Sequence, residues 1–303
     1  MTCACARRCL FGALLLLLPA TAAAAQDSVT FCAYNLRNWL SQTDPSSPAT
    51  TPRQKPEREK RKVIEFLGQI RPDILGVCEI GTPEDLADLQ SRLRSAGIDL
   101  PHHEFCRGAD PQRSLALLSR HPLSQRRSAG PLPYQINGET LRLQRGILDA
   151  SVAVAPGFEL RFLGVHLKSR REVAEADQDL MRRSEAHLLR RHLDTIYATE
   201  SRPALVVYGD FNAHRNEPAL LEVIGSRALD SHLLEIPVRD RHGLLWTHFW
   251  DAADVYSRLD YLLVSRTLRP RVDNARSRIF DDADFGVASD HRPLVLVLKP
   301  PAR

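Results

Sequence analysis

Short apolar runs rich in Val, Ile and Leu recur along the chain, and their length constrains the fold more than any other feature of the sequence. Runs of about four to eight residues bounded by turn-forming residues are typical of buried β-strands. Such runs lie at residues 29–34, 74–77, 115–119, 141–143, 147–154, 160–167, 204–208, 258–264 and 294–298. They fall into two groups with helical segments between them. This pattern predicts an α/β fold, with mixed sheets covered by helices in one compact domain.

Four segments have the periodicity or the capping signals of helices. Residues 57–70 place apolar side chains on one face, and Pro72 ends the segment. Thr82 and Pro83 have the pattern of an N-cap and a first helical turn, so a second helix is expected to begin there. A long charged helix is expected over about 172–198 and a shorter one near 217–224. On the long helix we expect Arg182-Arg183 and Arg190-Arg191 to form a solvated face.

The N-terminus has the three-part pattern of a secretory signal peptide. Arg7 and Arg8 precede an apolar run around residues 14–18, and small residues follow at 21–25. The apolar run is well short of the ~20 residues that a membrane-spanning helix needs. We therefore predict a signal peptide over residues 1–25 and a single mature domain over 26–303. The protein is then expected to be secreted or periplasmic, without a stable membrane anchor.

The composition allows a sizeable core but says little about the partner. Hydrophobic residues make up 43% and charged residues 26% of the chain. The formal net charge of +4 falls to about +2 once Arg7 and Arg8 leave with the signal peptide. A dedicated DNA-binding domain usually shows a clear basic excess. The net charge therefore neither supports nor excludes a nucleic-acid partner.

Three cysteines remain after the predicted cleavage: Cys32, Cys78 and Cys106. An odd number excludes complete intramolecular pairing. Since Cys32 and Cys78 lie in strand-like apolar runs, we expect small buried thiols. One disulfide is the open alternative, and no C-x₂-C spacing suggests a zinc site.

Polar residues stand at or beside the ends of the predicted strands. Five of them could act in catalysis or binding: Asn35, Glu79, His166, Asp210 and His291. Each one alone also fits a turn or a structural role. Ligand sites in α/β sheets collect at strand ends, so their shared placement predicts a common site.

The segment Gly209-Asp210-Phe211-Asn212 directly follows a buried strand and carries the clearest chemistry. There Asp210 could accept a proton from water while Asn212 donates a hydrogen bond to an anion. Asp260 lies within an apolar strand, where an unpaired carboxylate is costly. Its natural partner is a histidine whose tautomer it fixes, and a salt bridge to an arginine is the alternative. Asp290 precedes His291, where it could act as a metal ligand.

These segments together resemble the motif series of a known family. In chain order they are Tyr34-Asn35-Leu36, Cys78-Glu79, Leu117-Leu118-Ser119-Arg120, Val165-His166-Leu167, Gly209-Asp210-Phe211-Asn212, Arg258-Leu259-Asp260-Tyr261 and Ser289-Asp290-His291. The series is similar to that of the endonuclease/exonuclease/phosphatase superfamily, which includes deoxyribonuclease I, and it runs through nearly the whole mature chain. The resemblance implies a four-layer α/β sandwich, in which two mixed β-sheets pack face to face with helices outside.

The resemblance also implies a metal-dependent hydrolase acting on phosphate ester bonds. Glu79, helped by Asn35, is then expected to hold Mg²⁺, with Mn²⁺ or Ca²⁺ as substitutes, and Asp290 to contribute near the metal. Asp210 is expected to activate the attacking water and Asn212 to bind a phosphoryl oxygen. The expected role of His291, held by Asp260, is to stabilise or protonate the phosphate. His166 matches the second histidine of the deoxyribonuclease I and sphingomyelinase types.

Two positions depart from the family pattern. Arg37 stands where abasic endonucleases of the superfamily carry an aspartate, so a second metal site that uses this position is in doubt. Many members have a Tyr or Glu that supports a catalytic histidine before the run at 115–118, and Pro111-Gln112-Arg113-Ser114 offers no equivalent. For Arg113 the alternatives are a solvated surface arginine and a phosphate contact.

The substrate stays open between a nucleic acid, which we favour, and a lipid head group or inositol phosphate. A catalytically inactive binding protein on the same scaffold is the third reading, and the intact motif residues argue against it. Arginines in the central segment favour a basic cleft for nucleic acid: Arg107, Arg113, Arg120, Arg126, Arg127, Arg142 and Arg145. A lipid enzyme needs an apolar surface, and the only candidates, Trp246, Phe249 and Trp250, are expected to pack as core or rim. We expect a monomer.

Overall fold

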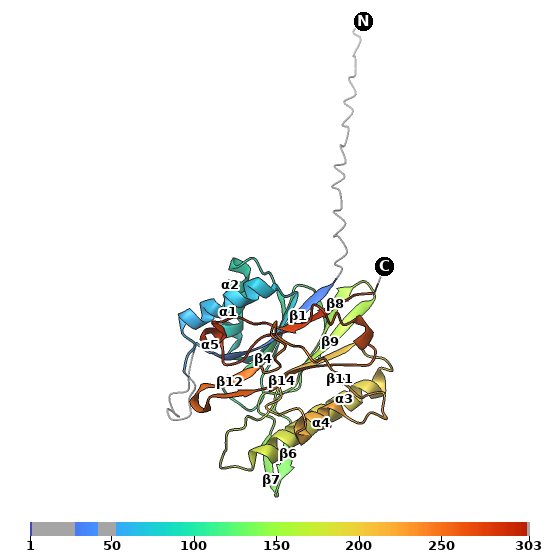
Figure 1. The fold of residues 1–303 in the computed structure, drawn as a ribbon. Coiled ribbons are helices and arrows are strands. Elements are labelled where there is room, and N and C mark those ends of the chain that lie inside the picture. The colour runs from blue at the N-terminus through green and yellow to red at the C-terminus, as the bar shows by residue number, and fades with distance from the viewer. Residues whose placement is uncertain (2–27, 42–52, 302–303) are drawn as a thin grey trace.

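Two six-stranded β-sheets pack face to face and carry helices on their outer sides (Figure 1). The computed structural model describes Met1, residues 28–41 and residues 53–301. The predicted signal peptide, Met1 apart, therefore lies outside the described residues. The predicted four-layer α/β sandwich is confirmed. No helix in the described ranges is long and apolar enough to cross a membrane.

The first sheet has the strand order β15-β16-β1-β2-β4-β3. Its strands are β1 (Val29–Trp39), β2 (Ile74–Ile80), β3 (His102–Cys106), β4 (Ser114–Ser119), β15 (Arg278–Ile279) and β16 (Leu294–Leu298). Its central strands β1 and β2 are parallel, whereas β16 and β4 pair antiparallel on either side of them. Helices α1 (Glu57–Ile70), α2 (Pro83–Ser95) and α5 (Phe285–Ala288) lie at this sheet.

The second sheet has the strand order β11-β14-β10-β9-β8-β5. Its strands are β5 (Leu123–Arg126), β8 (Leu148–Ala155), β9 (Phe158–His166), β10 (Leu205–Asp210), β11 (Leu234–Glu235) and β14 (Asp260–Val264). Helices α3 (Gln178–Thr199) and α4 (Pro218–Ile224) cover its outer face. Two hairpins stand apart from the sheets: β6 (Pro133–Ile136) with β7 (Glu139–Arg142), and β12 (His248–Trp250) with β13 (Val255–Ser257).

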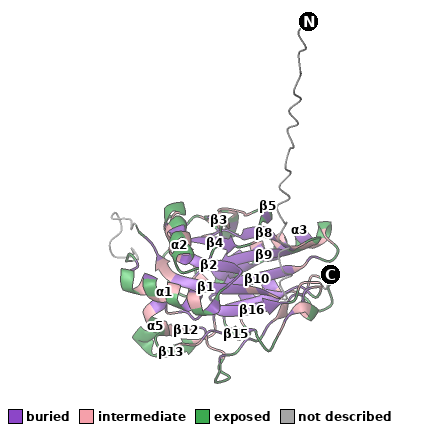
Figure 2. Cartoon of the chain, turned by 90° about the horizontal axis from the view of Figure 1, so that it is seen from above, coloured by how far each residue is buried: buried purple, intermediate pink, exposed green. Residues whose placement is uncertain are grey.

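Side chains alternate along each central strand between the space that separates the sheets and the helix layer. In β1, Phe31 and Ala33 pack between the sheets, whereas Cys32 and Tyr34 face the helices. Both sheets are therefore buried on both faces, and exposed positions concentrate on the outer sides of the helices (Figure 2). The same alternation decides which polar residues at the strand ends point between the sheets.

Aromatic rings fill the space between the two sheets. The ring centroid of Phe31 lies 4.8 Å from that of Phe162 and 4.8 Å from that of Tyr208. Gly76 makes room for Tyr208, because a Cβ atom there would lie 2.2 Å from a Tyr208 ring carbon. The sheet separation thus depends on a large ring that faces a residue without a side chain.

The apolar face and the capping residues predicted the positions of the first two helices correctly. The segment 57–70 is helical over its whole predicted length. At the second helix the Thr82 hydroxyl accepts the Asp85 N–H and the Asp85 carboxylate accepts the Thr82 N–H, which forms a capping box. The three cysteines of the described residues are buried free thiols, as expected.

Several predicted boundaries were wrong. β1 does not end at Asn35 but continues to Trp39 through an irregular pairing with β2, so Asn35 lies inside the strand. Helix α3 begins at Gln178 and not at residue 172, because the Asp177 carboxylate caps the free N–H groups there. The solvated arginine face predicted for α3 was also wrong in part. Arg182 and Arg190 are buried, and only the arginine after each of them is exposed.

Candidate active site

The site begins with three residues that lie side by side in the second sheet. Asp210 at the end of β10 pairs in register with His166 of β9 on one side and with Asp260 of β14 on the other. Neighbouring residues in register point to the same face of a sheet. Tyr208, two residues before Asp210, packs between the sheets, so all three side chains face that space. Strand pairing alone brings His166, Asp210 and Asp260 together, as the sequence predicted.

His291 reaches the same place from the first sheet, just before β16. Its Nδ1 donates to Asp260 Oδ2 over 2.8 Å, and its Nε2 lies 3.6 Å from Asp210 Oδ2. Burial alone lowers the pKa of His291, but the charges of Asp260 and Asp210 outweigh it and hold this pKa well above its usual value. The two carboxylates therefore favour the protonated form of His291, whose ring is oriented by Asp260 and directed at Asp210.

The surroundings of Asp210 disfavour the charged form of its carboxyl. Burial, together with the nearby carboxylates of Asp260 and Glu79, raises the pKa of this carboxyl to about 7, although the charge of His291 lowers it. A carboxyl whose pKa lies near neutrality can accept a proton from water and release it again. The predicted role of Asp210 as a base thus has a physical basis in its surroundings.

Glu79 enters the site through an unusual backbone conformation. Its φ of 62° lies in the left-handed region, which breaks the side-chain alternation of β2 at that point. Its Oε2 accepts the N–H of Asn38, whose own φ is 59°. This local strain places the carboxylate at the mouth of the inter-sheet space.

Asn35 connects Glu79 to Asp210. Its Nδ2 donates to Glu79 Oε1 over 3.3 Å and to Asp210 Oδ2 over 3.1 Å, and its Oδ1 accepts the Arg37 N–H. In this arrangement the Asn35 amide offers its nitrogen, and not its oxygen, to the carboxylates. Asn35 as a direct metal ligand remains a prediction.

His166 is held as a neutral imidazole. Its Nε2 lies 3.7 Å from Asp210 Oδ2 and 4.0 Å from Glu79 Oε1. Burial and then the charges of Arg145 and Arg113 lower the pKa of His166 well below its usual value. The surroundings therefore favour the protonated form of His291 and the neutral form of His166.

Two further predicted residues lie around this group. Asn212, with φ 48°, donates one amide N–H to the Leu167 carbonyl, and its backbone N–H donates to Asp210 Oδ1. Asp290 is partly exposed; its carboxylate lies 3.5 Å from Arg37 and accepts from the Ser289 hydroxyl. The anion contact of Asn212 and metal binding by Asp290 stay predictions.

The donor set suits a divalent ion. Asp210, Asp260 and His291 are buried, and each offers a ligand atom within 4.8 Å of the others. Glu79 adds a third carboxylate, which the Asn35 amide joins to Asp210 by hydrogen bonds. Several buried carboxylates in one place repel each other unless a cation joins them, and oxygen donors suit Mg²⁺. The group is thus consistent with a divalent-metal site.

Arg113 is not a solvated surface arginine, because its side chain is paired on several sides. Its Nε donates to Asn38 Oδ1 over 2.8 Å, and its guanidinium lies 3.6 Å from both Glu79 and Asp110. Asp110 also pairs with the buried Arg145 over 3.3 Å. Arg113 therefore supports Glu79, and its contact with phosphate stays a prediction.

The arginine-lined cleft predicted from the central segment was wrong for Arg120. Arg120 directly follows β4, at the end that pairs with the start of β2. Its guanidinium lies 3.1 Å from Asp73, at the edge of the sheet away from Glu79. Arg113 and Arg145 of this segment lie close enough to His166 to lower its pKa. Further basic groups beside the site come from another segment.

A cavity of about 670 Å³ opens beside the catalytic group. Asn212 and His291 form one end, and Arg170, Arg171, His214, His248, Trp250, Val255, Ser257 and Leu259 form the rest. Trp250 was expected in the core or rim, but it is 56% exposed on the β12–β13 hairpin. The other two aromatic residues of that segment, Trp246 and Phe249, pack against Tyr256 and Phe285 without it.

His248 and Thr247 were missed by the sequence analysis. The ring centroid of His248 lies 4.6 Å from that of His291, and the two residues form an isolated β-bridge. The Thr247 hydroxyl accepts the N–H of Asp260, and its carbonyl accepts the N–H of Arg292. Thr247 thus fixes the two segments that carry the His291–Asp260 pair. Only the aromatic-rich sequence around them could have drawn attention to this stretch.

Comparison with known proteins agrees with this geometry. Residues 36–291 match the model of the endonuclease/exonuclease/phosphatase family, and the chain belongs to that family. It is a hydrolase that acts on phosphoester bonds. No match was found among curated protein sequences.

Solved structures share the fold at low sequence identity. The catalytic domain of human Nocturnin with a bound sulfate anion has a TM-score of 0.63 and 18% identity over 90% of this chain and 94% of its own. Sphingomyelinase C from Streptomyces griseocarneus has a TM-score of 0.62 and 14% identity, covering 90% and 100%. Truncated TDP2 from Caenorhabditis elegans has a TM-score of 0.57 and 18% identity, covering 90% and 98%. At these identities the likeness establishes the fold alone.

Proposed function

We propose that this phosphoesterase is a nuclease that hydrolyses phosphodiester bonds of DNA or RNA with the help of a Mg²⁺-class ion. One observation carries the proposal: His166, Asp210 and Asp260 occupy one row of the second sheet, and His291 faces them from the other sheet 3.6 Å from Asp210. This arrangement supplies a base and an oriented acid at the mouth of a cavity.

Phosphodiester hydrolysis needs an activated nucleophile, neutralisation of the non-bridging oxygens and stabilisation of the leaving oxygen. Asp210 accepts the proton of the attacking water. The imidazolium of His291 donates a hydrogen bond or a proton to the phosphate, and Asp260 holds that ring in place. The second amide N–H of Asn212 binds a phosphoryl oxygen, as does the neutral ring of His166.

Glu79 and Asp290 would hold the ion beside the buried group of Asp210, Asp260 and His291, and Asn35 would help by fixing the Glu79 carboxylate. When bound, a Mg²⁺-class ion supplies positive charge to the phosphoryl oxygens without a proton transfer. Mn²⁺ or Ca²⁺ would substitute where oxygen ligands suffice.

The cavity beside the catalytic group favours nucleic acid as the substrate. Trp250 offers an exposed aromatic face, and Arg170 and Arg171 line the same space. Proteins that bind single strands combine aromatic faces for the bases with cations for the backbone. A base next to the scissile phosphate would find both in this cavity.

A second candidate is a phosphodiesterase or phosphatase acting on lipid head groups or inositol phosphates. The specific observation in its favour is that Trp250, Val255 and Tyr256 expose 56%, 44% and 55% of their surface on one hairpin. Exposed apolar groups of this kind suit contact with a lipid surface. Asp251 and Asp254 at the same turn oppose it for anionic membranes.

A substrate panel tests the proposal. Plasmid DNA, RNA, sphingomyelin, an inositol phosphate and bis(4-nitrophenyl) phosphate are offered to the mature protein with Mg²⁺, Mn²⁺, Ca²⁺ or EDTA. We expect metal-dependent cleavage of a nucleic acid at a higher kcat/KM than any lipid, and none in EDTA. Preference for sphingomyelin or an inositol phosphate would move the assignment to the second candidate. No turnover of any substrate would support an inactive binding protein.

We also propose that the chain is exported and acts as a monomer without a stable membrane anchor. The support for export is the signal-peptide pattern at residues 1–25. Expression of the full chain in a bacterial host should give a periplasmic product whose N-terminus lies near Gln26. A product that keeps Met1 and stays in the cytoplasm would contradict export, and gel filtration checks the monomer.

A further inference from the structure

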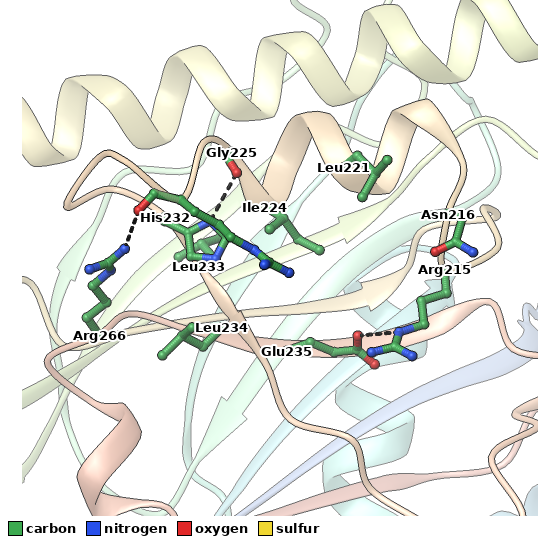
Figure 3. Close-up of a pocket in the computed structure, with 11 residues that line it drawn as sticks. Arg215, Asn216, Leu221, Ile224, Gly225, His232, Leu233, Leu234, Glu235 and Arg266 are labelled. Carbon is green, nitrogen blue, oxygen red and sulfur yellow. Dashed lines mark hydrogen bonds and ion pairs between the residues drawn. The ribbon is translucent and has the colours of Figure 1, made fainter.

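A second cavity, of about 750 Å³, lies between helix α4 and the edge strand β11 of the second sheet (Figure 3). Leu221, Ile224, Leu233 and Leu234 supply apolar side chains to it. Arg215, Arg227 and Arg266 bring three guanidinium groups to the same cavity, and His232 adds an imidazole. None of these residues belongs to the catalytic group.

The charges of this second cavity do not cancel internally. Its one carboxylate, Glu235, already pairs with Arg215 over 3.2 Å and with Arg258. Arg266 donates to the Arg227 carbonyl, and no carboxylate of the described residues lies within 4.0 Å of the guanidinium of Arg227 or Arg266. The cavity therefore has a positive excess that an anionic ligand would neutralise.

This second cavity adjoins the catalytic one through a single loop. His214 lines the catalytic cavity and Arg215 lines the second one, although their Cα atoms are only about 3.8 Å apart along the chain. The loop that carries both follows Asn212 directly and is closed by the His214 N–H donating to the Glu217 carboxylate. An elongated substrate held at Asn212 could cross this loop into the second cavity.

We propose that the cavity between α4 and β11 is a second binding subsite, which takes a backbone phosphate of the same nucleic-acid strand, remote from the scissile one. Arg227 and Arg266 pair with the phosphate, and the apolar side chains contact the sugar and base. The inference rests on the proposed nuclease function and adds to it: long strands are preferred over short ones because only they reach this subsite. A small phosphoester held in the catalytic cavity gains nothing from it.

The test compares kcat/KM of the wild-type protein with that of Arg227→Gln/Arg266→Gln. The substrates are single-stranded DNA of about 16 and about 4 nucleotides, together with bis(4-nitrophenyl) phosphate. The matched control is Arg58→Gln/Arg61→Gln, which removes two exposed arginines of α1 that also lack a carboxylate within 4.0 Å among the described residues. Arg227→Lys/Arg266→Lys keeps the charge and should restore activity.

We expect kcat/KM on the long strand to fall about tenfold, with a change of less than about twofold on the short strand and the small ester. The slope of log kcat/KM against log salt should become less negative by about 0.7, because one phosphate contact is lost. The control should leave both quantities unchanged.

Equal losses on long and short strands, or losses no larger than those of the control, would overturn the subsite. So would a result in which the variant keeps long-strand activity but loses binding to phosphatidylglycerol vesicles, because the cavity would then serve an anionic lipid. These outcomes differ from failure of the proposed function, in which the wild-type protein itself cleaves no nucleic acid.

Discussion

Two carboxylates face the imidazole of His291 from adjacent strands, and the whole charge pattern of the site follows from their placement. Asp260 holds Nδ1, so the other ring nitrogen points at Asp210. Both carboxylates raise the pKa of His291, and Asp260 also raises that of Asp210. An acid and a base with complementary protonation states thus share one buried space.

Asp260→Asn is the most informative single change at this scale. It removes a charge that raises the pKa of both His291 and Asp210, so both limbs of the pH profile of kcat/KM should move to lower pH. The falling limb, set by His291, should shift by about 1 to 3 units and the maximum rate should fall about 10²- to 10⁴-fold. The profile is measured with bis(4-nitrophenyl) phosphate, and a falling limb that stays in place would remove Asp260 as the partner that sets the charge of His291.

Motif residues were predictable from the sequence where regular strand pairing positions them. His166, Asp210 and Asp260 each end or begin a strand, so their meeting follows from register. Asn35 was placed wrongly because β1 continues through it, and its role as a link between Glu79 and Asp210 depends on an irregular backbone. Arg145 reaches the site from a loop and His248 from the short hairpin strand β12, where no periodicity indicates which way a side chain points.

At the scale of elements, the packing of the two sheets depends on which residues face Tyr208. Gly76→Ala would put a Cβ atom 2.2 Å from the ring, inside a space that both sheets enclose. Because neither sheet can move away freely, we expect a loss of about 2–3 kcal/mol and a lower Tm. Thermal unfolding followed by circular dichroism measures it.

Gly68→Ala is the matched control for that change. Gly68 lies in α1, and a Cβ atom there meets nothing within 4 Å. Alanine favours a helix over glycine, so this variant should gain about 0.5–1 kcal/mol. Two variants that shift Tm in the same direction would show that the ring of Tyr208 does not set the sheet separation.

Helix positions were predictable where a cap or an amphipathic face defines them. α1 and α2 carry such signals within their own sequence. The start of α3 was placed too early because residues 172–177 are as charged as the helix itself, and only the capping carboxylate of Asp177 decides where it begins. The strand order of each sheet could not be derived from the sequence, since β1 pairs with β16 from the far end of the chain.

At the scale of the whole molecule, the site lies where strand ends of both sheets converge, so its carboxylates repel each other across the interface between the sheets. A divalent ion that binds only the folded protein should relieve this repulsion and raise Tm. At an ion concentration of 100 Kd the gain is about 2.7 kcal/mol, which corresponds to roughly 5–10 °C for a domain of this size.

Titration of the EDTA-treated protein with Mg²⁺ during thermal unfolding measures this gain. Glu79→Gln should abolish most of it, whereas Glu65→Gln, an exposed carboxylate of α1, should not. An unchanged Mg²⁺ effect in Glu79→Gln would place the ion elsewhere.

The proposed hydrolysis depends most on the pair formed by Asp210 and His291, and turnover of Asp210→Ala and His291→Ala tests this pair most directly. With Mg²⁺ and bis(4-nitrophenyl) phosphate, each variant should lose at least about 10³-fold in kcat and keep its circular dichroism spectrum. Asp99→Ala and His187→Ala, which change exposed residues of the same types, should keep full activity. Folded variants of Asp210 and His291 with activity within about tenfold of the parent enzyme would contradict the proposed mechanism.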